Sequence, residues 1–209
     1  MEYNEKQKQI IETAERLFSA RGYDGTSVRD LADDAGVNIA MISYYFGSKE
    51  KLMEALFEQR TTNIKLKVES LLHDNKTMPL QKVELLAEDF ISRIVEKKQF
   101  FKIMLCEQVI NKNPVIINLI HDLKKRNVEE FTKLITDGQQ KGAFKNNIDV
   151  LLLMNTLIGV VTQMMLTLDY YREYNNLKNV SDNQLYEQIK LKLTEHIKVL
   201  FKALLSYEA

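Results

Sequence analysis

The sequence has few of the residues that interrupt helices, and almost no cysteine. Its 209 residues include two prolines, seven glycines, a single cysteine and no tryptophan. Because proline and glycine are the residues least tolerated inside helices, helices can run long with few breaks. Cys106 has no partner for an intramolecular disulfide, and the first nine residues, MEYNEKQKQ, lack the apolar core of a signal peptide. These features predict a cytoplasmic protein in a reducing compartment.

The sequence also lacks net charge. It carries 29 basic and 29 acidic residues, and residues 1–60 alone hold 8 Lys or Arg against 11 Asp or Glu, a net of −3. A DNA-binding domain usually presents a basic surface, so this composition provides no general affinity for nucleic acid. DNA binding is not excluded, because hydroxyl groups, backbone N–H groups and helix N-termini also contact phosphates.

The apolar residues follow a helical pattern. Strand-like alternation is missing, whereas apolar side chains recur at helical spacing almost throughout. Since 45% of the residues are hydrophobic, the chain can bury a core, and we predict an all-α protein. The predicted helices cover residues 4–20, a stretch from 48 with a bend or break near Thr61 and Thr62, and residues 80–98, 100–110, 114–141, 150–168 and 181–206.

Residues 150–168 contain no charged side chain, which raises the alternative of a membrane span. The run includes polar residues and is flanked by Asp149 and Asp169 rather than by basic anchors. We therefore favour a helix that is buried all round, in the core and in a subunit interface, and no membrane partner. Together with residues 181–206, this helix predicts a homodimer that closes through a four-helix bundle.

Residues 26–52, TSVRDLADDAGVNIAMISYYFGSKEKL, have the pattern of two short helices joined by a tight turn. Ser27 and Asp30 form a helix-start pair. Gly36 can take the positive φ that ends a helix, and Asn38 can cap the next one. Two helices joined in this way form either a helix-turn-helix, whose second helix can enter the major groove of DNA, or a purely structural hairpin. The pattern alone leaves both interpretations open.

Two stretches, IIETAERLFSARGYDGTSVRDLADDAGVN and SYYFGSKEKLMEAL, agree in order and spacing with the N-terminal domain of the TetR family of transcriptional regulators. The first 60 or so residues resemble that domain, and the rest resembles the family only in length and helical character. The resemblance implies a three-helix helix-turn-helix domain over residues 1–60. A long helix would join it to a helical ligand-binding and dimerisation domain over residues 61–209.

The resemblance also implies which side chains meet DNA. Those expected to face base edges or their sugars are Ile39, Ala40, Ser43 and Tyr44, and those expected to touch the DNA backbone are Ser27, Tyr45 and Lys49. Ser43 departs from the tyrosine commonly found at its position. Ile39 and Ala40 offer no hydrogen-bond donor, so recognition is expected to use thymine methyl groups and DNA shape. The alternative for the tyrosine pair is an aromatic cluster with Phe46 at the edge of the core.

The apolar C-terminal part offers candidates for an effector pocket, or for ordinary core. The apolar candidates are Phe90, Ile94, Phe101, Met104, Ile120 and Met154. Three polar residues lie within apolar helices and would either orient a ligand or form internal hydrogen bonds: Gln108, Asn155 and Gln163. The scarcity of charge among these segments predicts a largely apolar effector with one polar head.

No catalytic or metal-binding constellation is evident in the sequence. The histidines are scattered, without a carboxylate or cysteine at ligand spacing: His73, His121 and His196. Cys106 lies in an apolar helix and is expected to be a buried, inert thiol. The neighbouring carboxylates Asp33 and Asp34, and likewise Glu129 and Glu130, are expected to be solvated. We therefore expect no cofactor, no metal and no enzymatic activity.

These expectations combine into one functional hypothesis. The chain is predicted to be a homodimeric transcriptional regulator, a repressor, that binds a palindromic operator in double-stranded DNA. A small, largely apolar effector would release it by shifting the helix that begins after Ser48 and so changing the separation of the two recognition helices. The alternative is a DNA-binding activator or accessory factor without a small-molecule ligand.

Overall fold

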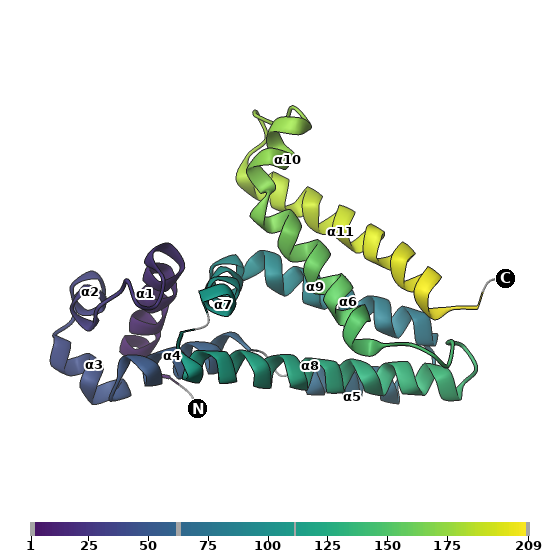
Figure 1. Ribbon diagram of the computed structural model, residues 1–209, viewed down its shortest axis with the longest axis horizontal. Helices are drawn as coiled ribbons and strands as arrows, with labels where there is room; N and C mark the ends of the chain where they lie inside the picture. Colours follow the sequence, from purple (N-terminus) through teal and green to yellow (C-terminus); the bar gives the residue numbers. More distant parts are fainter. Residues whose placement is uncertain (1–2, 62–63, 111, 208–209) are drawn as a thin grey trace. The chain divides into compact units, whose positions relative to one another are not determined.

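The computed structural model describes residues 3–61, 64–110 and 112–207, and within these ranges every regular element is a helix (Figure 1). The prediction of an all-α protein is confirmed. In chain order the helices are α1 Glu5–Arg21, α2 Val28–Asp34, α3 Ile39–Phe46, α4 Lys49–Arg60, α5 Ile64–His73, α6 Pro79–Glu96, α7 Lys98–Ile110, α8 Pro114–Gln140, α9 Val150–Leu166, α10 Leu168–Tyr174 and α11 Asp182–Leu205.

The predicted break after the fourth helix is present. α4 ends at Arg60, and Thr61 follows in an extended conformation with φ −87° and ψ 96°. Thr62, the other residue of the predicted break, lies outside the described residues. α4 therefore ends before α5 begins at Ile64, and the two are separate helices.

The chain divides into two compact units, and neither is continuous in sequence. The first unit contains residues 1–62 and 97–125, and the second contains residues 63–96 and 126–209. The boundary predicted from the sequence falls instead after residue 60, which places residues 97–125 with the C-terminal part. In the structure these residues pack with the N-terminal helices. The assignment of separate functions to residues 1–60 and 61–209 remains a prediction.

The first unit is organised around α1. This helix packs against α2, α4 and α7, while α3 contacts α2 and α4. One face of α1 is buried, and it includes Ile10, Ala14 and Leu17. The first residues of α7 close the other side of this core, where the ring of Phe100 meets that of Phe57 edge-on at a centroid distance of 4.9 Å.

The second unit is organised around α6. This helix packs against α5, α9 and α11, and α9 also packs against α11. The buried apolar side chains of α6 include Val83, Leu86, Ala87, Phe90, Ile91 and Ile94. Lys82 is buried beside them, with its Nζ 3.9 Å from a carboxylate oxygen of Asp137 on α8. Sequence reasoning did not predict that this lysine would be internal.

The uncharged helix α9 is buried on one side only in the single chain, and the burial of its other side in a subunit interface remains a prediction. Leu153, Met154 and Leu157 face the core, whereas Leu152 and Leu166 are exposed. The reason is that α6 and α11 cover one side of α9 and leave the other uncovered. Among the described residues no single helix is both long and apolar enough to cross a membrane. α9 and α10 meet that requirement only as a pair, and they are bent by 69° at their junction.

Two expectations about solvent exposure are wrong. Cys106 is exposed rather than buried, because α7 turns Phe100, Ile103, Met104 and Glu107 inward and Cys106 lies outside that face. Glu130 is buried rather than solvated, and its Oε1 accepts a hydrogen bond of 2.6 Å from Lys133.

Candidate nucleic-acid interface

The turn between α2 and α3 is built from the local signals that the sequence contains. Ser27 caps α2 by accepting a hydrogen bond from the backbone N–H of Asp30, and the Asp30 carboxylate accepts one in return from the Ser27 N–H at 2.8 Å. Gly36 takes φ +61°, the conformation that favours glycine. Asn38 caps α3 through a 3.0 Å bond from the N–H of Ala40. The predicted helix-turn-helix is therefore formed, with its caps where they were expected.

The two faces of α3 differ sharply in exposure. Ile42 is 1% exposed and anchors the helix against Leu31 and Ala32, which belong to the same buried core cluster. The opposite face consists of the four residues expected to meet base edges, all of them exposed: Ile39, Ala40, Ser43 and Tyr44. Tyr44 is 83% exposed. α3 thus presents a short, mostly uncharged face on a rigid support.

The two tyrosines of α3 have different surroundings. Tyr45 is half-buried and packs with Phe46 against the core, with a ring separation of 6.4 Å from Phe46. Tyr44 touches Tyr45 edge-on at 5.2 Å and otherwise projects into solvent. The core-edge interpretation therefore describes Tyr45 and Phe46, and Tyr44 is the residue free to meet a partner. A backbone contact from Tyr45 remains a prediction.

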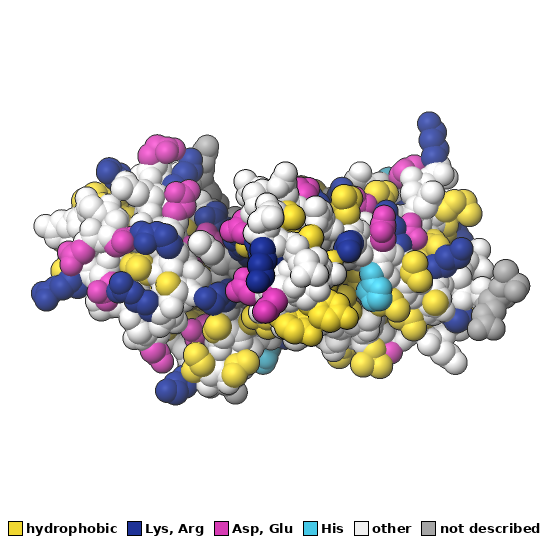
Figure 2. Space-filling model, turned by 90° about the horizontal axis from the view of Figure 1, so that it is seen from above, with side chains coloured by type: hydrophobic (Ala, Val, Ile, Leu, Met, Phe, Trp, Pro, Cys, Tyr) yellow, Lys and Arg dark blue, Asp and Glu magenta, His cyan; other side chains and the backbone are white. Residues whose placement is uncertain are grey.

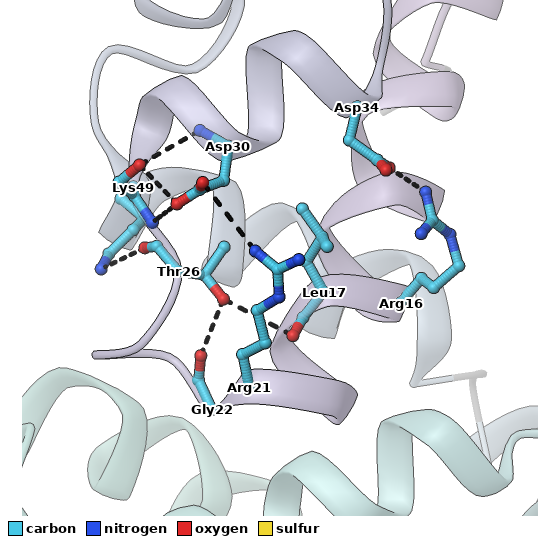
Figure 3. Close-up of polar contacts among 9 residues, drawn as sticks. Arg16, Leu17, Arg21, Gly22, Thr26, Asp30, Asp34 and Lys49 are labelled. Atoms are coloured by element: carbon cyan, nitrogen blue, oxygen red, sulfur yellow. Dashed lines mark hydrogen bonds and ion pairs between the residues drawn. The ribbon is translucent and has the colours of Figure 1, made fainter.

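Lys49 is held by the turn that precedes α2. Its Nζ donates to the backbone oxygens of Tyr23 and Thr26, both at 3.0 Å, and lies 4.0 Å from the centroid of the Tyr23 ring. Figure 3 shows the ammonium reaching from α4 to the Thr26 carbonyl. Two of its three hydrogens are thereby used, which leaves one for a phosphate. This internal role was not predicted, because Lys49 is separated from its two partners by more than twenty positions in the sequence.

Acidic residues of α2 pair with the arginines of α1. Arg16 is hydrogen-bonded to Asp34, and Arg21 lies 3.8 Å from Asp30 (Figure 3). Hydrogen bonds from the Ser27 hydroxyl and N–H hold the pKa of Asp30 below its ordinary value, so this carboxyl stays charged at neutral pH. Figure 2 shows acidic and basic side chains interspersed over the N-terminal helices on the face in view. The face in view therefore carries both signs of charge rather than a basic patch.

The candidate effector residues are not gathered in one unit. Four of them belong to the first unit, where Met104 and Ile120 are part of the buried core cluster: Phe101, Met104, Gln108 and Ile120. Five belong to the second unit, where the first three are buried and the last two are exposed: Phe90, Ile94, Met154, Asn155 and Gln163. Gln108 uses its amide locally, donating to the Met104 carbonyl and accepting from Lys124. A common pocket for the nine remains a prediction.

Comparison with known proteins identifies the first part of the chain. Residues 10–56, which hold α1 to most of α4, match the family described as bacterial regulatory proteins, tetR family. The N-terminal domain belongs to the TetR family. A further match is to the probable HTH-type transcriptional regulator YttP of Bacillus subtilis, which is 54% identical over 50 residues, or 24% of this chain and 24% of that protein.

The likeness to TetR-family proteins extends more weakly over the whole chain. The probable acrEF/envCD operon repressor of Escherichia coli is 23% identical over 185 residues, covering 85% of this chain and 84% of that protein. The solved structure of the ketosteroid transcriptional regulator KstR2 of Mycobacterium tuberculosis covers 99% of this chain and 98% of its own, with 19% identity and a TM-score of 0.71. The structural likeness shows that the fold is shared.

The position of Lys49 generates a prediction about stability. Lys49→Ala removes a half-buried ammonium together with its two hydrogen bonds to the carbonyls of Tyr23 and Thr26. We therefore expect the free energy of unfolding to fall by roughly 1.5–3 kcal/mol. The matched control is Lys51→Ala in the same helical turn, whose exposed ammonium meets only Glu54 in the structure, at 2.7 Å. That variant should change stability by less than about 0.5 kcal/mol.

Urea unfolding followed by circular dichroism measures both variants. Equal stability of the two would contradict the internal role of Lys49. If the third hydrogen of Lys49 also meets a phosphate, the slope of log affinity for DNA against log salt should flatten by about 0.9 in Lys49→Ala.

Proposed function

We propose that this protein is a DNA-binding transcriptional regulator whose helix α3 enters the major groove. The observation that carries the proposal is the exposed face of Ile39, Ala40, Ser43 and Tyr44, which a capped helix-turn-helix of the TetR family holds outward. Such a supported helix is the element that reads base edges in helix-turn-helix proteins.

The chemistry of this face sets how it would read DNA. Ile39 and Ala40 have only apolar groups, which suit thymine methyl groups, and the Ser43 hydroxyl can donate to or accept from a base edge. The phenol of Tyr44 can reach a phosphate or a sugar. Ser27 contributes less freely, because its hydroxyl already donates to Asp30 at 2.5 Å. Backbone N–H groups at the N-terminus of α2 are the alternative donors there.

The first test identifies the DNA and then removes Tyr44. Selection from a randomised duplex library with the wild-type protein should enrich a palindrome. Tyr44→Ala should weaken binding to that duplex by about 1–3 kcal/mol, with little change in stability because the side chain is exposed.

The control for this substitution is Tyr170→Ala, which removes a tyrosine that is 67% exposed on α10 in the second unit. It should leave DNA affinity unchanged. The recognition-helix assignment is wrong if the two variants bind the selected duplex equally well.

The palindrome follows from a proposed homodimer. α9 and α11 pack on each other, and each carries large apolar side chains that are exposed in the single chain: Leu151, Leu152 and Leu166 on α9, and Leu191, Val199 and Leu204 on α11. Figure 2 shows hydrophobic side chains gathered on the part of the molecule that contains these helices. An exposed apolar surface of this kind is typical of an interface, and two helices from each copy would form a four-helix bundle.

Sedimentation should therefore give about twice 24.4 kDa at micromolar concentration. Leu152→Glu places a charge in the proposed interface and should shift the protein towards monomer. Leu66→Glu is a matched control, since Leu66 and Leu152 are each the third residue of a helix and are 62% and 63% exposed. Monomeric wild-type protein, or equal effects of the two substitutions, would count against the dimer and the palindrome.

We also propose regulation by a largely apolar effector bound in the second unit. The unit has an apolar interior, with Phe90, Ile94 and Met154 buried in it. Support comes from relatives: the fatty acid metabolism regulator of Bacillus subtilis is 24% identical over 162 residues, and a solved structure of FadR from that organism is in complex with stearoyl-CoA. Repression is proposed because several relatives are named repressors.

The route of such a signal differs from the one that the sequence suggested. α4 ends at Arg60 within the first unit, so no continuous helix leads from residue 48 into the second unit. α8 begins in the first unit and ends in the second, because the boundary falls between residues 125 and 126. We propose that α8, rather than α4, carries the conformational change.

Micromolar palmitate should release the selected duplex, whereas coenzyme A without an acyl chain should not. Fluorescence anisotropy of the labelled duplex measures the release. Release by coenzyme A and not by palmitate would contradict an apolar effector. A duplex that no amphipathic compound releases would favour the alternative, an activator or accessory factor without a ligand.

A further inference from the structure

A buried carboxylate on α7 is bonded to the turn that leads into the helix-turn-helix. The side chain belongs to Glu107, which is 5% exposed, and its Oε1 accepts a hydrogen bond of 3.2 Å from the backbone N–H of Tyr23. The two residues are 84 positions apart and both lie in the first unit. Glu107 is not among the residues expected to touch DNA.

The same turn is fixed from two other helices. Lys49 of α4 holds the carbonyl oxygens of Tyr23 and Thr26. The Thr26 side chain is fully buried and donates to the carbonyl of Gly22 at 2.9 Å, at the end of α1 (Figure 3). The Tyr23 ring packs on Phe18 of α1 at 5.4 Å. Glu107 supplies the remaining bond, the one to the Tyr23 N–H.

The burial of this carboxylate is tied to its bond with the turn. Removing a carboxylate from water is unfavourable unless hydrogen bonds or a cation compensate. Among the described residues, no lysine, arginine or histidine forms an ion pair with Glu107, and its hydrogen-bond partner is the Tyr23 N–H. The bond to Tyr23 is therefore the contact through which Glu107 acts on the turn.

We propose that Glu107 is a positioning residue for DNA binding, an inference that rests on the proposed function. By fixing Tyr23 it fixes the path of residues 23–26, which sets where Ser27 starts α2 and hence where the helix-turn-helix lies relative to α1. A turn freed at Tyr23 samples other conformations. The apparent affinity for DNA then falls by the fraction of molecules that retain the competent one.

The proposal predicts an effect opposite in sign to simple electrostatics. DNA is a polyanion, so removing a carboxylate from the domain favours binding through charge alone. Positioning predicts the reverse: Glu107→Ala should weaken binding to the selected duplex by about tenfold. Glu107→Gln keeps an oxygen that can accept from the Tyr23 N–H and should bind within about twofold of the wild type.

The wild-type protein first selects a duplex, which is then labelled. Each full-length variant is titrated into this duplex at a temperature where circular dichroism shows that the variant is folded. Amide hydrogen exchange at Tyr23 is measured in parallel and should accelerate in the variants that lack an acceptor at position 107, and not in Glu107→Gln. Glu107→Met, which keeps the length of the side chain without an acceptor, replaces the alanine variant if that one does not fold. The control for a general loss of stability is Glu15→Ala, since Glu15 is 7% exposed and bonded to Arg60 at 2.6 Å, away from the turn.

Weaker binding by Glu107→Ala or Glu107→Met, with Glu107→Gln and Glu15→Ala near the wild type, supports the proposal. Binding by the acceptor-free variant that is equal to or tighter than the wild type overturns it. So does a glutamine variant as weak as the alanine one, or unchanged exchange at Tyr23. If the wild-type protein enriches no duplex, both the proposed function and the role of Glu107 in DNA binding fail. If it does enrich a duplex and Glu107→Ala binds that duplex normally, only the role of Glu107 fails.

Discussion

Helices α1 to α4 depend on apolar contacts that they cannot complete among themselves. A domain of about 60 residues buries only a modest fraction of its surface, and its stability is correspondingly marginal. Here Phe100 closes against Phe57, and four further apolar residues of α7 and α8 join the same core: Ile103, Met104, Ile116 and Ile120. The core behind the helix-turn-helix is therefore completed by a segment that begins about fifty residues after α3 ends. Because that segment lies in α7 and α8, a displacement of these helices also disturbs the core on which α3 packs.

Polar contacts fix the turn before α2 and the ends of α2 and α3, which the apolar core alone does not position. The turn before α2 is bonded to α1, α4 and α7, and the caps of α2 and α3 are formed within the motif itself. Both arginines at the C-terminal half of α1 pair with carboxylates of α2. Charged side chains of the first unit are thus paired with one another. A surface organised in this way gives little attraction to DNA in general, so in the proposed function the discrimination between sequences depends on the fit of α3 to base edges.

The sequence was sufficient for features that depend on near neighbours. Ser27, Gly36 and Asn38 act within a few residues of their partners, so their roles could be predicted from residue type and spacing. Features that depend on contacts between distant segments could not. The bond from Tyr23 to Glu107, the exposure of Cys106 and the burial of Glu130 follow from which side of a helix meets another helix, and a periodic apolar pattern is too coarse to decide single positions on α7 and α8. The membership of residues 97–125 in the first unit was missed for the same reason.

The interleaving of the two units has a consequence for biosynthesis. The ribosome delivers the helix-turn-helix first, yet the residues that close its core, up to Ile120, follow only after α5 and α6 have been made. During that interval the apolar side chains of α1 and α4 that pack against α7 have no partner to bury them. The second unit is interrupted in the same way, because α5 and α6 precede the first unit's last segment and wait for α9 and α11. The two units therefore cannot fold one after the other as the chain is synthesised. Until the later helices are made, both cores are incomplete and their exposed apolar surfaces can associate wrongly.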